Sequence, residues 1–302
     1  KILITLRELN SLITPSANSY LSSEQRIKLA EQAMHTVAHP RSTDQGSHNT
    51  CGATSAEVVL GAKYPERLVN LLNQIADSGE YHTAKGLWLK PSSQSLEADA
   101  EASSFDPYDA ASEGVRSYVG QLVQTVGIDS IFAARNQAKI YESKDIREYV
   151  LRTDTGDVTS FDGLEDPDVH EMLRQLSGDD VEIYSKNKQF DSADSLQNVL
   201  NQLKQSNAFP VVFSVDILKQ GPFLNQYRED RAGLDDGGHY VTIWDIDSNG
   251  NVQIDDQFGR AYDFESLRRV PVADLFESSM TLRAAPVPHM PFMVPKKARP
   301  GN

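Results

Sequence analysis

Cys51 is the only cysteine in this chain of 302 residues, and it follows the polar stretch 41–50. A lone cysteine is either a small buried side chain or a nucleophile. It can form no intrachain disulfide, and it excludes a four-cysteine site for zinc or an iron–sulfur cluster. A thiol becomes reactive when a helix N-terminus and a neighbouring imidazolium stabilise its thiolate. The residues before Cys51 and the histidines of the chain therefore decide between the two interpretations.

Gln45 and Gly46 precede Cys51, with Gln45 six residues before it, and a helical pattern begins at Cys51 itself. These residues resemble the active-site segment of papain-like cysteine peptidases, which place a glutamine at this distance from the nucleophile. The resemblance implies that the side-chain amide of Gln45 and the backbone N–H of Cys51 bind the oxyanion of a tetrahedral intermediate. On residue type alone, Gln45 is also compatible with a turn in a polar loop.

His239 has the context expected of a general base. It follows two glycines and begins the apolar run 240–244, which predicts a strand. Papain-like enzymes carry their base at such a position. The last hundred residues, from about Leu196, also loosely resemble the bacterial peptidases that trim double-glycine leader peptides. The alternative is a histidine that simply ends a buried strand.

The other six histidines have contexts that fit a base less well. His35 and His39 have the i, i+4 spacing of metal ligands, but no carboxylates accompany them, so we interpret them as part of a helix surface. His48 is near Cys51 in the approach loop and is the alternative base. The remaining three are predicted to be surface residues: His82, His170 and His289.

Asp256 is the candidate for the third group, which holds the other ring N–H of the base. It precedes residues 257–259, Gln-Phe-Gly, and this segment is similar to the papain-family segment in which Asn or Asp precedes a polar residue, an aromatic residue and a glycine. Strand alternation places Asp256 on the face of the apolar Val252 and Ile254. The resemblance therefore implies a triad of Cys51, His239 and Asp256.

The turn at Asn249-Gly250 predicts a hairpin between strands 239–246 and 252–258. A two-residue turn would pair Asp256 with Ile243, some residues from the histidine, so a bulge or strong twist is needed to bring the two together. Asp255 and Asp236 therefore stay as alternatives to Asp256.

The same hairpin also fits the spacing of an EF-hand calcium loop, with Asp245, Asp247, Asn249 and Gly250 followed by Asp256 at the twelfth position. An EF-hand needs a helix on each side and prefers a final glutamate. The flanks here are rich in Val, Ile and Thr, which favours strands. We therefore predict a hairpin, with no metal and no cofactor.

The elements that must position these residues change in type along the chain. Apolar periodicity predicts helices over 22–37, 58–75 with an interruption near Gly61 and Pro65, 114–126 and 166–176, and it leaves 90–111 as a surface loop. Strands are predicted over 181–184, 209–215, 239–246 and 252–258, with a helix over 192–204. We expect an α+β, papain-like domain over 1–284, with a helical half at 1–178 packed against an antiparallel sheet half at 179–284, and a proline-rich tail at 285–302.

Composition narrows the classes of function. The net charge of −14 argues against a general nucleic-acid binder, and no apolar run approaches the length that spans a bilayer. The acidic segment 95–109 is either a solvated loop or a cover for the cleft that docks a basic partner. Because the chain begins at Lys1 rather than Met, we expect a mature or excised product.

The sequence therefore predicts a hydrolase, a thiol protease that cleaves peptide bonds through a Cys-His-Asp triad and an acyl-enzyme. The same triad serves a protein glutamine deamidase, an acyltransferase or a cell-wall amidase, and a catalytically silent papain-like binding module is the alternative of another class. The expected partners are a protein or peptide substrate and an inhibitory or delivery partner, with no nucleic acid and no membrane. The resemblance suits a secreted or translocated bacterial effector.

Overall fold

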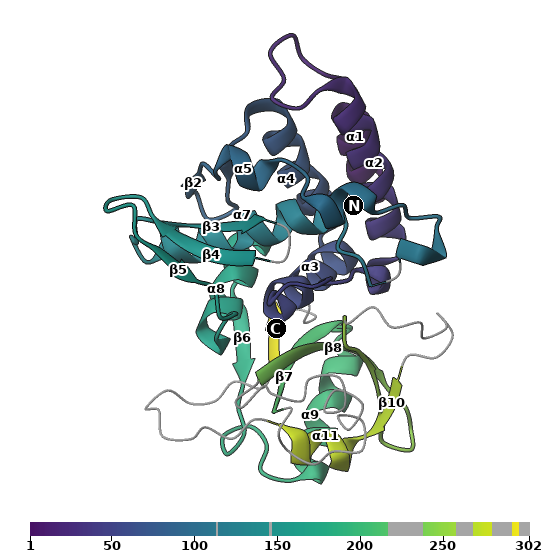
Figure 1. The fold of residues 1–302 in the computed structure, drawn as a ribbon. Coiled ribbons are helices and arrows are strands. Elements are labelled where there is room, and N and C mark those ends of the chain that lie inside the picture. Colours follow the sequence, from purple (N-terminus) through teal and green to yellow (C-terminus); the bar gives the residue numbers. More distant parts are fainter. Residues whose placement is uncertain (113, 145–146, 217–237, 258–267, 280–291, 296–302) are drawn as a thin grey trace. The chain divides into compact units, whose positions relative to one another are not determined.

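A computed structural model describes residues 1–112, 114–144, 147–216, 238–257, 268–279 and 292–295 (Figure 1). The chain divides into two compact units. Unit 1 holds Lys1–Gly178 and, from later in the chain, Gln257; unit 2 holds the described residues from Asp179 to Asp256 and those after residue 267. Helices and antiparallel strands make this an α+β protein, which confirms the predicted class.

The apolar periodicity predicts some of the helices of unit 1, most closely those near 22–37, 58–75 and 166–176, and does not predict others. The helices of this unit are α1 (Ile2–Leu12), α2 (Ser23–Ala38), α3 (Cys51–Lys63), α4 (Pro65–Ser78), α5 (Ser93–Leu96), α6 (Ala100–Ser104), α7 (Tyr118–Ala134) and α8 (Asp166–Ser177), with 3-10 turns at Pro40–Ser42 and Ala110–Ser112. Of the helices that the structure describes, none is long and apolar enough to cross a membrane.

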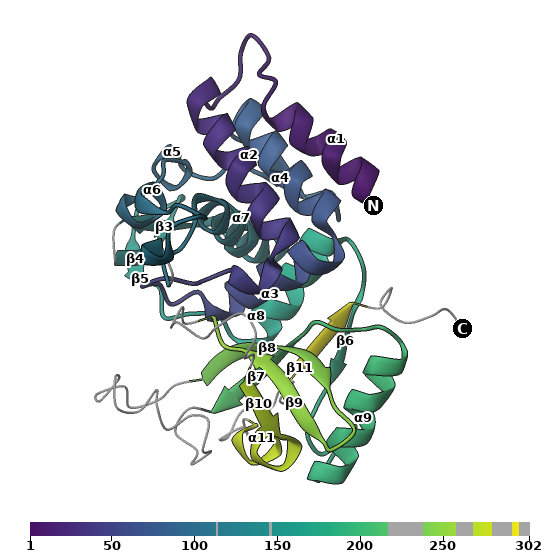
Figure 2. The ribbon, with the colours of Figure 1, turned by 90° about the vertical axis from the view of Figure 1, so that its right-hand side faces the viewer.

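Helix α2 shows how local chemistry sets a boundary. The Ser22 hydroxyl accepts from the backbone N–H of Gln25, and the Gln25 side chain accepts from the N–H of Ser22, which is a capping box. The helix ends just before the His39-Pro40 pair. Helices α1, α2 and α4 contact one another and lie side by side in Figure 2.

Helices α3 and α7 form the centre of unit 1. Residues 52–61 of α3 are all buried, and so are residues 118–131 of α7. Helix α3 packs against α4, α7 and α8. The helix that begins at Cys51 is therefore surrounded by protein along most of its length.

Unit 1 also contains strands that the periodicity does not predict. They are β1 (Tyr81–His82) paired with β2 (Trp88–Leu89), and the antiparallel sheet β3 (Lys139–Lys144), β4 (Arg147–Arg152) and β5 (Val158–Ser160). The prediction of a surface loop over 90–111 is wrong. The side chains of Ser92 and Asp99 cap α5 and α6, and Leu96, Ala102 and Phe105 are buried.

The described part of unit 2 consists of one antiparallel sheet with the helices α9 and α11. Its elements are β6 (Val181–Tyr184), α9 (Ala193–Gln205), β7 (Val211–Asp216), β8 (Gly238–Ile246), β9 (Asn251–Asp255), β10 (Arg268–Pro271), α11 (Val272–Ser278) and β11 (Phe292–Pro295). The strand order is β10-β9-β8-β7-β11-β6. Helices α9 and α11 contact each other, and they contact β8 and β7 respectively. Strand β11 lies where the sequence predicts a tail.

The β8–β9 hairpin forms as predicted, but its register differs. The Asp247 carboxylate accepts from the backbone N–H groups of Asn249 and Asn251 and so shapes the turn. Ile246 pairs with Val252, and a bulge between Ile243 and Asp245 then shifts the pairing, so that Ile243 faces Ile254. The predicted pairing of Asp256 with Ile243 is therefore wrong, and the bulge that the sequence analysis required is present. The flanks of the turn are strands, as the hairpin interpretation expects.

Arg26 binds the C-terminal end of helix α1, and its substitution tests how much these hydrogen bonds stabilise unit 1. Its fully buried guanidinium donates to the carbonyl oxygens of Leu12 (2.7 Å) and Ser11 (3.0 Å) at the end of α1, and it bonds the Asp77 carboxylate at 2.7 Å. Helix ends leave carbonyls that need such donors. We expect Arg26→Met to lower the free energy of unfolding by about 2–4 kcal/mol in urea titrations. Arg7→Met, at an exposed position, is the control, and an equal loss in both variants contradicts the assignment.

Candidate active site

Cys51 is the first residue of α3, as the sequence predicts, and the residue is partly exposed. Thr50 is the N-cap, and Thr54 donates its backbone N–H to the Thr50 carbonyl oxygen at 2.8 Å. Within the described part of the chain, the Thr50 side chain makes no capping hydrogen bond. The first-turn N–H groups of α3 are therefore not capped by this residue, and the positive end of the helix dipole lies at the thiol.

Gln45 lies in the loop before α3 and is buried. Its side-chain Nε2 donates to the carbonyl oxygen of His48 at 2.8 Å, and its backbone N–H donates to the carbonyl oxygen of Gln257 at 3.1 Å. An amide nitrogen carries two hydrogens, so the bond to His48 leaves one for another acceptor. This geometry fixes the side chain of Gln45 within its own loop.

Gln257 belongs to unit 1, and the sequence alone did not indicate its role at the site. It is buried, and its φ of 55° is in the left-handed region, which is uncommon for a residue other than glycine. Its side-chain oxygen accepts from the Ser55 hydroxyl at 2.8 Å, one turn after Cys51, while its backbone oxygen accepts from Gln45. Gln257 therefore ties the loop of Gln45 to helix α3. The similarity of the 256–259 segment to the papain family was the signal that could have indicated it.

His239 lies near the start of β8 in unit 2 and is buried. It pairs with Val215 of β7, and its Nε2 is 2.9 Å from the backbone carbonyl oxygen of Asp256. A carbonyl oxygen can only accept, so Nε2 carries the hydrogen. In the neutral ring, the lone pair is then on Nδ1. The contact with Asp256 thus selects Nδ1 as the basic atom.

The three candidate orienting carboxylates differ in what surrounds them. Asp256 follows the end of β9, and the contact described above runs through its backbone oxygen. Asp255 faces Thr242, whose hydroxyl donates to it at 3.4 Å. Asp236 lies outside the described residues. Unit 1 therefore holds Cys51 and Gln45, and unit 2 holds His239 and both described aspartates.

The remaining histidines are placed as follows. His48, the alternative base, is fully buried among carboxylates of unit 1. His35 and His39 have ring centroids 5.2 Å apart, and burial together with His39 lowers the pKa of His35. Among the described residues, no group of three or more His, Cys, Asp or Glu could hold a metal ion. His82 is exposed as predicted, and its ring contacts that of Trp88, whereas His170 is only half-exposed and His289 lies outside the described residues.

Glu57 is a second residue that sequence reasoning missed. It lies in the buried part of α3, and its carboxylate accepts from the Gln124 side chain at 3.1 Å. Burial raises the pKa of Glu57 to about 8, against the smaller opposing effects of the Gln124 bond and of Arg116. A carboxyl group thus stays largely protonated on the helix that carries the candidate nucleophile.

Comparison with known proteins adds nothing to these observations. No protein-family model matches the chain, and no curated protein or solved structure matches it either. The assignment of a function therefore rests on the residues and contacts described above.

Glu57 predicts a particular dependence of stability on pH. Its pKa is about 8 in the folded protein and 4.5 without the fold, so the protonated carboxyl stabilises the folded state below pH 4.5 and this contribution is lost as pH rises towards 8. Glu57→Gln keeps the shape and cannot ionise. We expect the free energy of unfolding of Glu57→Gln, relative to the wild type, to rise with pH, with a slope approaching about 1.4 kcal/mol per pH unit in this window.

Urea titrations between pH 5 and 8 measure that difference, and Glu24→Gln, at an exposed position, is the control. A difference between Glu57→Gln and the wild type that does not change with pH would contradict the buried, protonated carboxyl.

Proposed function

We propose that this protein is a cysteine peptidase of papain-like fold that hydrolyses peptide bonds, with Cys51 as nucleophile and His239 as general base. The observation that carries the proposal is the position of the chain's only cysteine at the first residue of a buried helix. The helix N-terminus favours the thiolate there. A helical unit that carries the thiol and a sheet unit that carries the imidazole also suit a papain-like arrangement.

The proposed cycle begins with a proton transfer from the Cys51 thiol to Nδ1 of His239. The thiolate attacks the carbonyl carbon of the peptide, a C–S bond forms, and the C–N bond breaks as the leaving amine takes the proton from His239. Water then gives a proton to His239 and attacks the thioester, which releases the carboxylic acid and restores the thiol. The carbonyl oxygen of Asp256 keeps the other ring nitrogen protonated throughout.

The oxyanion of each tetrahedral intermediate needs hydrogen-bond donors. The proposal gives this task to the backbone N–H of Cys51 and to the second amide hydrogen of Gln45, since the first is bonded to His48. Removal of one such donor typically lowers the rate about 10²–10³-fold. No cofactor enters this cycle.

The same thioester chemistry serves other reactions on amides, which differ in the amide that the thiolate attacks and in whether water or another nucleophile accepts the acyl group. Hydrolysis of a glutamine side chain would release ammonia without new peptide ends, and cleavage of a peptide bond would create new ends without ammonia. A protein or peptide is the proposed substrate in either reaction.

Alkylation of Cys51 by iodoacetamide over a range of pH tests the proposal. Because the chain has one cysteine, the modified mass reports this residue alone. We expect fast alkylation that persists well below the ordinary thiol pKa of about 8.5 and that slows at neutral pH in His239→Ala. His82→Ala, at an exposed histidine of the other unit, should leave the profile unchanged. A slow rate that rises only near about 8.5 in all three proteins would contradict the proposal.

A further inference from the structure

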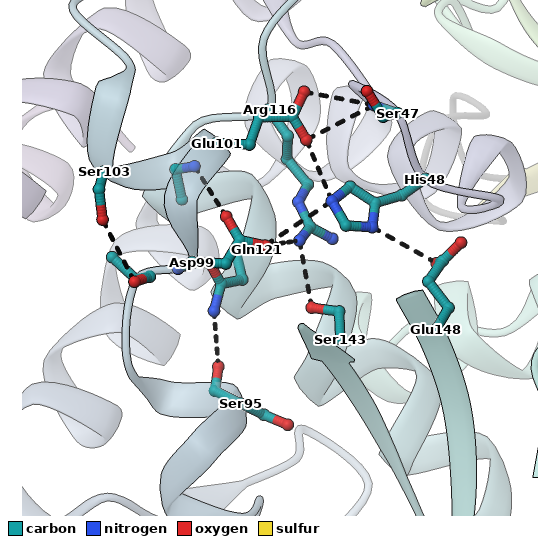
Figure 3. Close-up of polar contacts among 12 residues, drawn as sticks. Ser47, His48, Ser95, Asp99, Glu101, Ser103, Arg116, Gln121, Ser143 and Glu148 are labelled. Carbon is teal, nitrogen blue, oxygen red and sulfur yellow. Dashed lines mark hydrogen bonds and ion pairs between the residues drawn. The ribbon is translucent and has the colours of Figure 1, made fainter. Parts of the chain in front are cut away.

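His48 lies buried among the carboxylates of Asp99, Glu101 and Glu148 in unit 1 (Figure 3). Its side chain is fully buried. Nε2 lies 3.0 Å from a carboxylate oxygen of Glu101, and Nδ1 lies 3.8 Å from one of Glu148. These three residues are named the His48 cluster below. An imidazole buried between acids is an unusual feature for a loop, and it lies three residues before Cys51.

Glu101 also holds the backbone next to His48. Its carboxylate accepts from the backbone N–H of Ser47 at 3.2 Å. The same carboxylate lies over the α-carbon of Gly46, where a Cβ atom would collide with it, and Gly46 has a φ of +63°. Gly46 is therefore the residue that lets Glu101 approach this loop.

Glu148, on strand β4, binds the backbone of the loop on the Nδ1 side of His48. One of its oxygens accepts from the backbone N–H of Asn49 at 2.6 Å. The other accepts from the Tyr141 hydroxyl at 2.6 Å and is the one that faces Nδ1 of His48. Both oxygens act as acceptors, so the carboxylate cannot be replaced by an amide without losing one of these bonds.

Of the described carboxylates near His48, Asp99 is the one that pairs with a neighbouring arginine. The buried guanidinium of Arg116 bonds Asp99 at 2.5 Å and the Ser143 hydroxyl at 3.1 Å. Asp99 is 3.7 Å from Nε2 of His48, farther than Glu101. Asp99 is thus paired chiefly with Arg116, and the loop is held by the other two carboxylates.

We propose that His48 and Glu148, together with Glu101, are positioning residues that hold the loop 44–50 so that Gln45 can bind the oxyanion. The inference rests on the proposed function. Two contacts join the glutamates to this loop, Glu101 to Ser47 and Glu148 to Asn49, and a third within the loop joins the backbone carbonyl of His48 to the amide of Gln45. Loss of the cluster displaces the amide of Gln45, and it leaves Cys51 in place because α3 is held by its own packing.

Two reagents distinguish a displaced amide of Gln45 from a change at the Cys51 thiolate. Iodoacetamide reacts by displacement of iodide at a CH₂ group, and this step forms no oxyanion. p-Nitrophenyl acetate acetylates the thiol through a tetrahedral oxyanion and expels p-nitrophenolate. The ratio of the acetylation to the alkylation rate constant of Cys51 therefore reports the oxyanion donors, whereas the alkylation rate alone reports the thiolate. Cys51→Ser supplies the blank for both reagents.

We expect Glu148→Gln to lower this ratio about tenfold or more, with the alkylation rate and its pH profile unchanged. Gln45→Ala sets the full effect, about 10²–10³-fold. The double variant His48→Gln with Glu148→Gln should be no worse than the more affected single variant, because both act through one loop. Glu24→Gln, an exposed glutamate of α2, is the matched control and should match the wild type.

Unfolding midpoints are measured for each variant. If Glu148→Gln does not fold, Glu101→Gln, whose side chain is partly exposed, takes its place with the same expectation. The inference is overturned if Gln45→Ala lowers the ratio while Glu148→Gln and Glu101→Gln lower only the midpoint. A wild-type thiol that alkylates slowly and independently of His239 would instead overturn the proposed function, so the two failures differ.

Discussion

Burial of helix α3 is the constraint on which the rest of unit 1 depends. A helix that is enclosed over residues 52–61 must find a partner inside the protein for every polar side chain it carries. Ser55 bonds Gln257, and Glu57 bonds Gln124 and gives up its charge. Cys51, the first residue, is partly exposed at the end of the helix where anions are stabilised. Enclosing the helix thus fixes the position of Cys51, which stays partly exposed.

The loop that leads into this helix is held by side chains far away in the sequence. Glu101 and Glu148 bind its backbone N–H groups from outside, and His48 fills the space between the two carboxylates. Gln257 binds it from the other end through Gln45. A loop of polar residues has little intrinsic structure, so these long-range contacts replace the regular hydrogen bonds that it lacks.

Sequence reasoning succeeded where local chemistry sets the structure. The capping box at Ser22 and the hairpin turn at Asn249-Gly250 are local signals, and both elements formed within a few residues of the prediction. Helix α1 was missed because its N-terminus has no side-chain cap and its C-terminus depends on Arg26, which is distant in sequence. The strands β3 to β5 carry many charged residues and show no clear apolar alternation.

In the candidate site, too, local features could be predicted from the sequence and tertiary features could not. Cys51, Gln45 and His239 could be proposed from types and spacing, because a helix start and a strand start are local features. The bulge that brings the Asp256 carbonyl oxygen to His239, the burial of Glu57 and the role of Gln257 are tertiary effects. No pattern of residue types within one segment determines them.

The proposed function requires a thiolate at Cys51 that His239 stabilises, and the ultraviolet absorbance of the thiolate tests this requirement directly. The difference spectrum between wild type and Cys51→Ser isolates one thiolate, because the chain has one cysteine. We expect this absorbance to persist well below about pH 8.5, and we expect His239→Ala to move its appearance up towards that value. An absorbance that appears only near about pH 8.5 in both proteins would contradict the proposed role of His239.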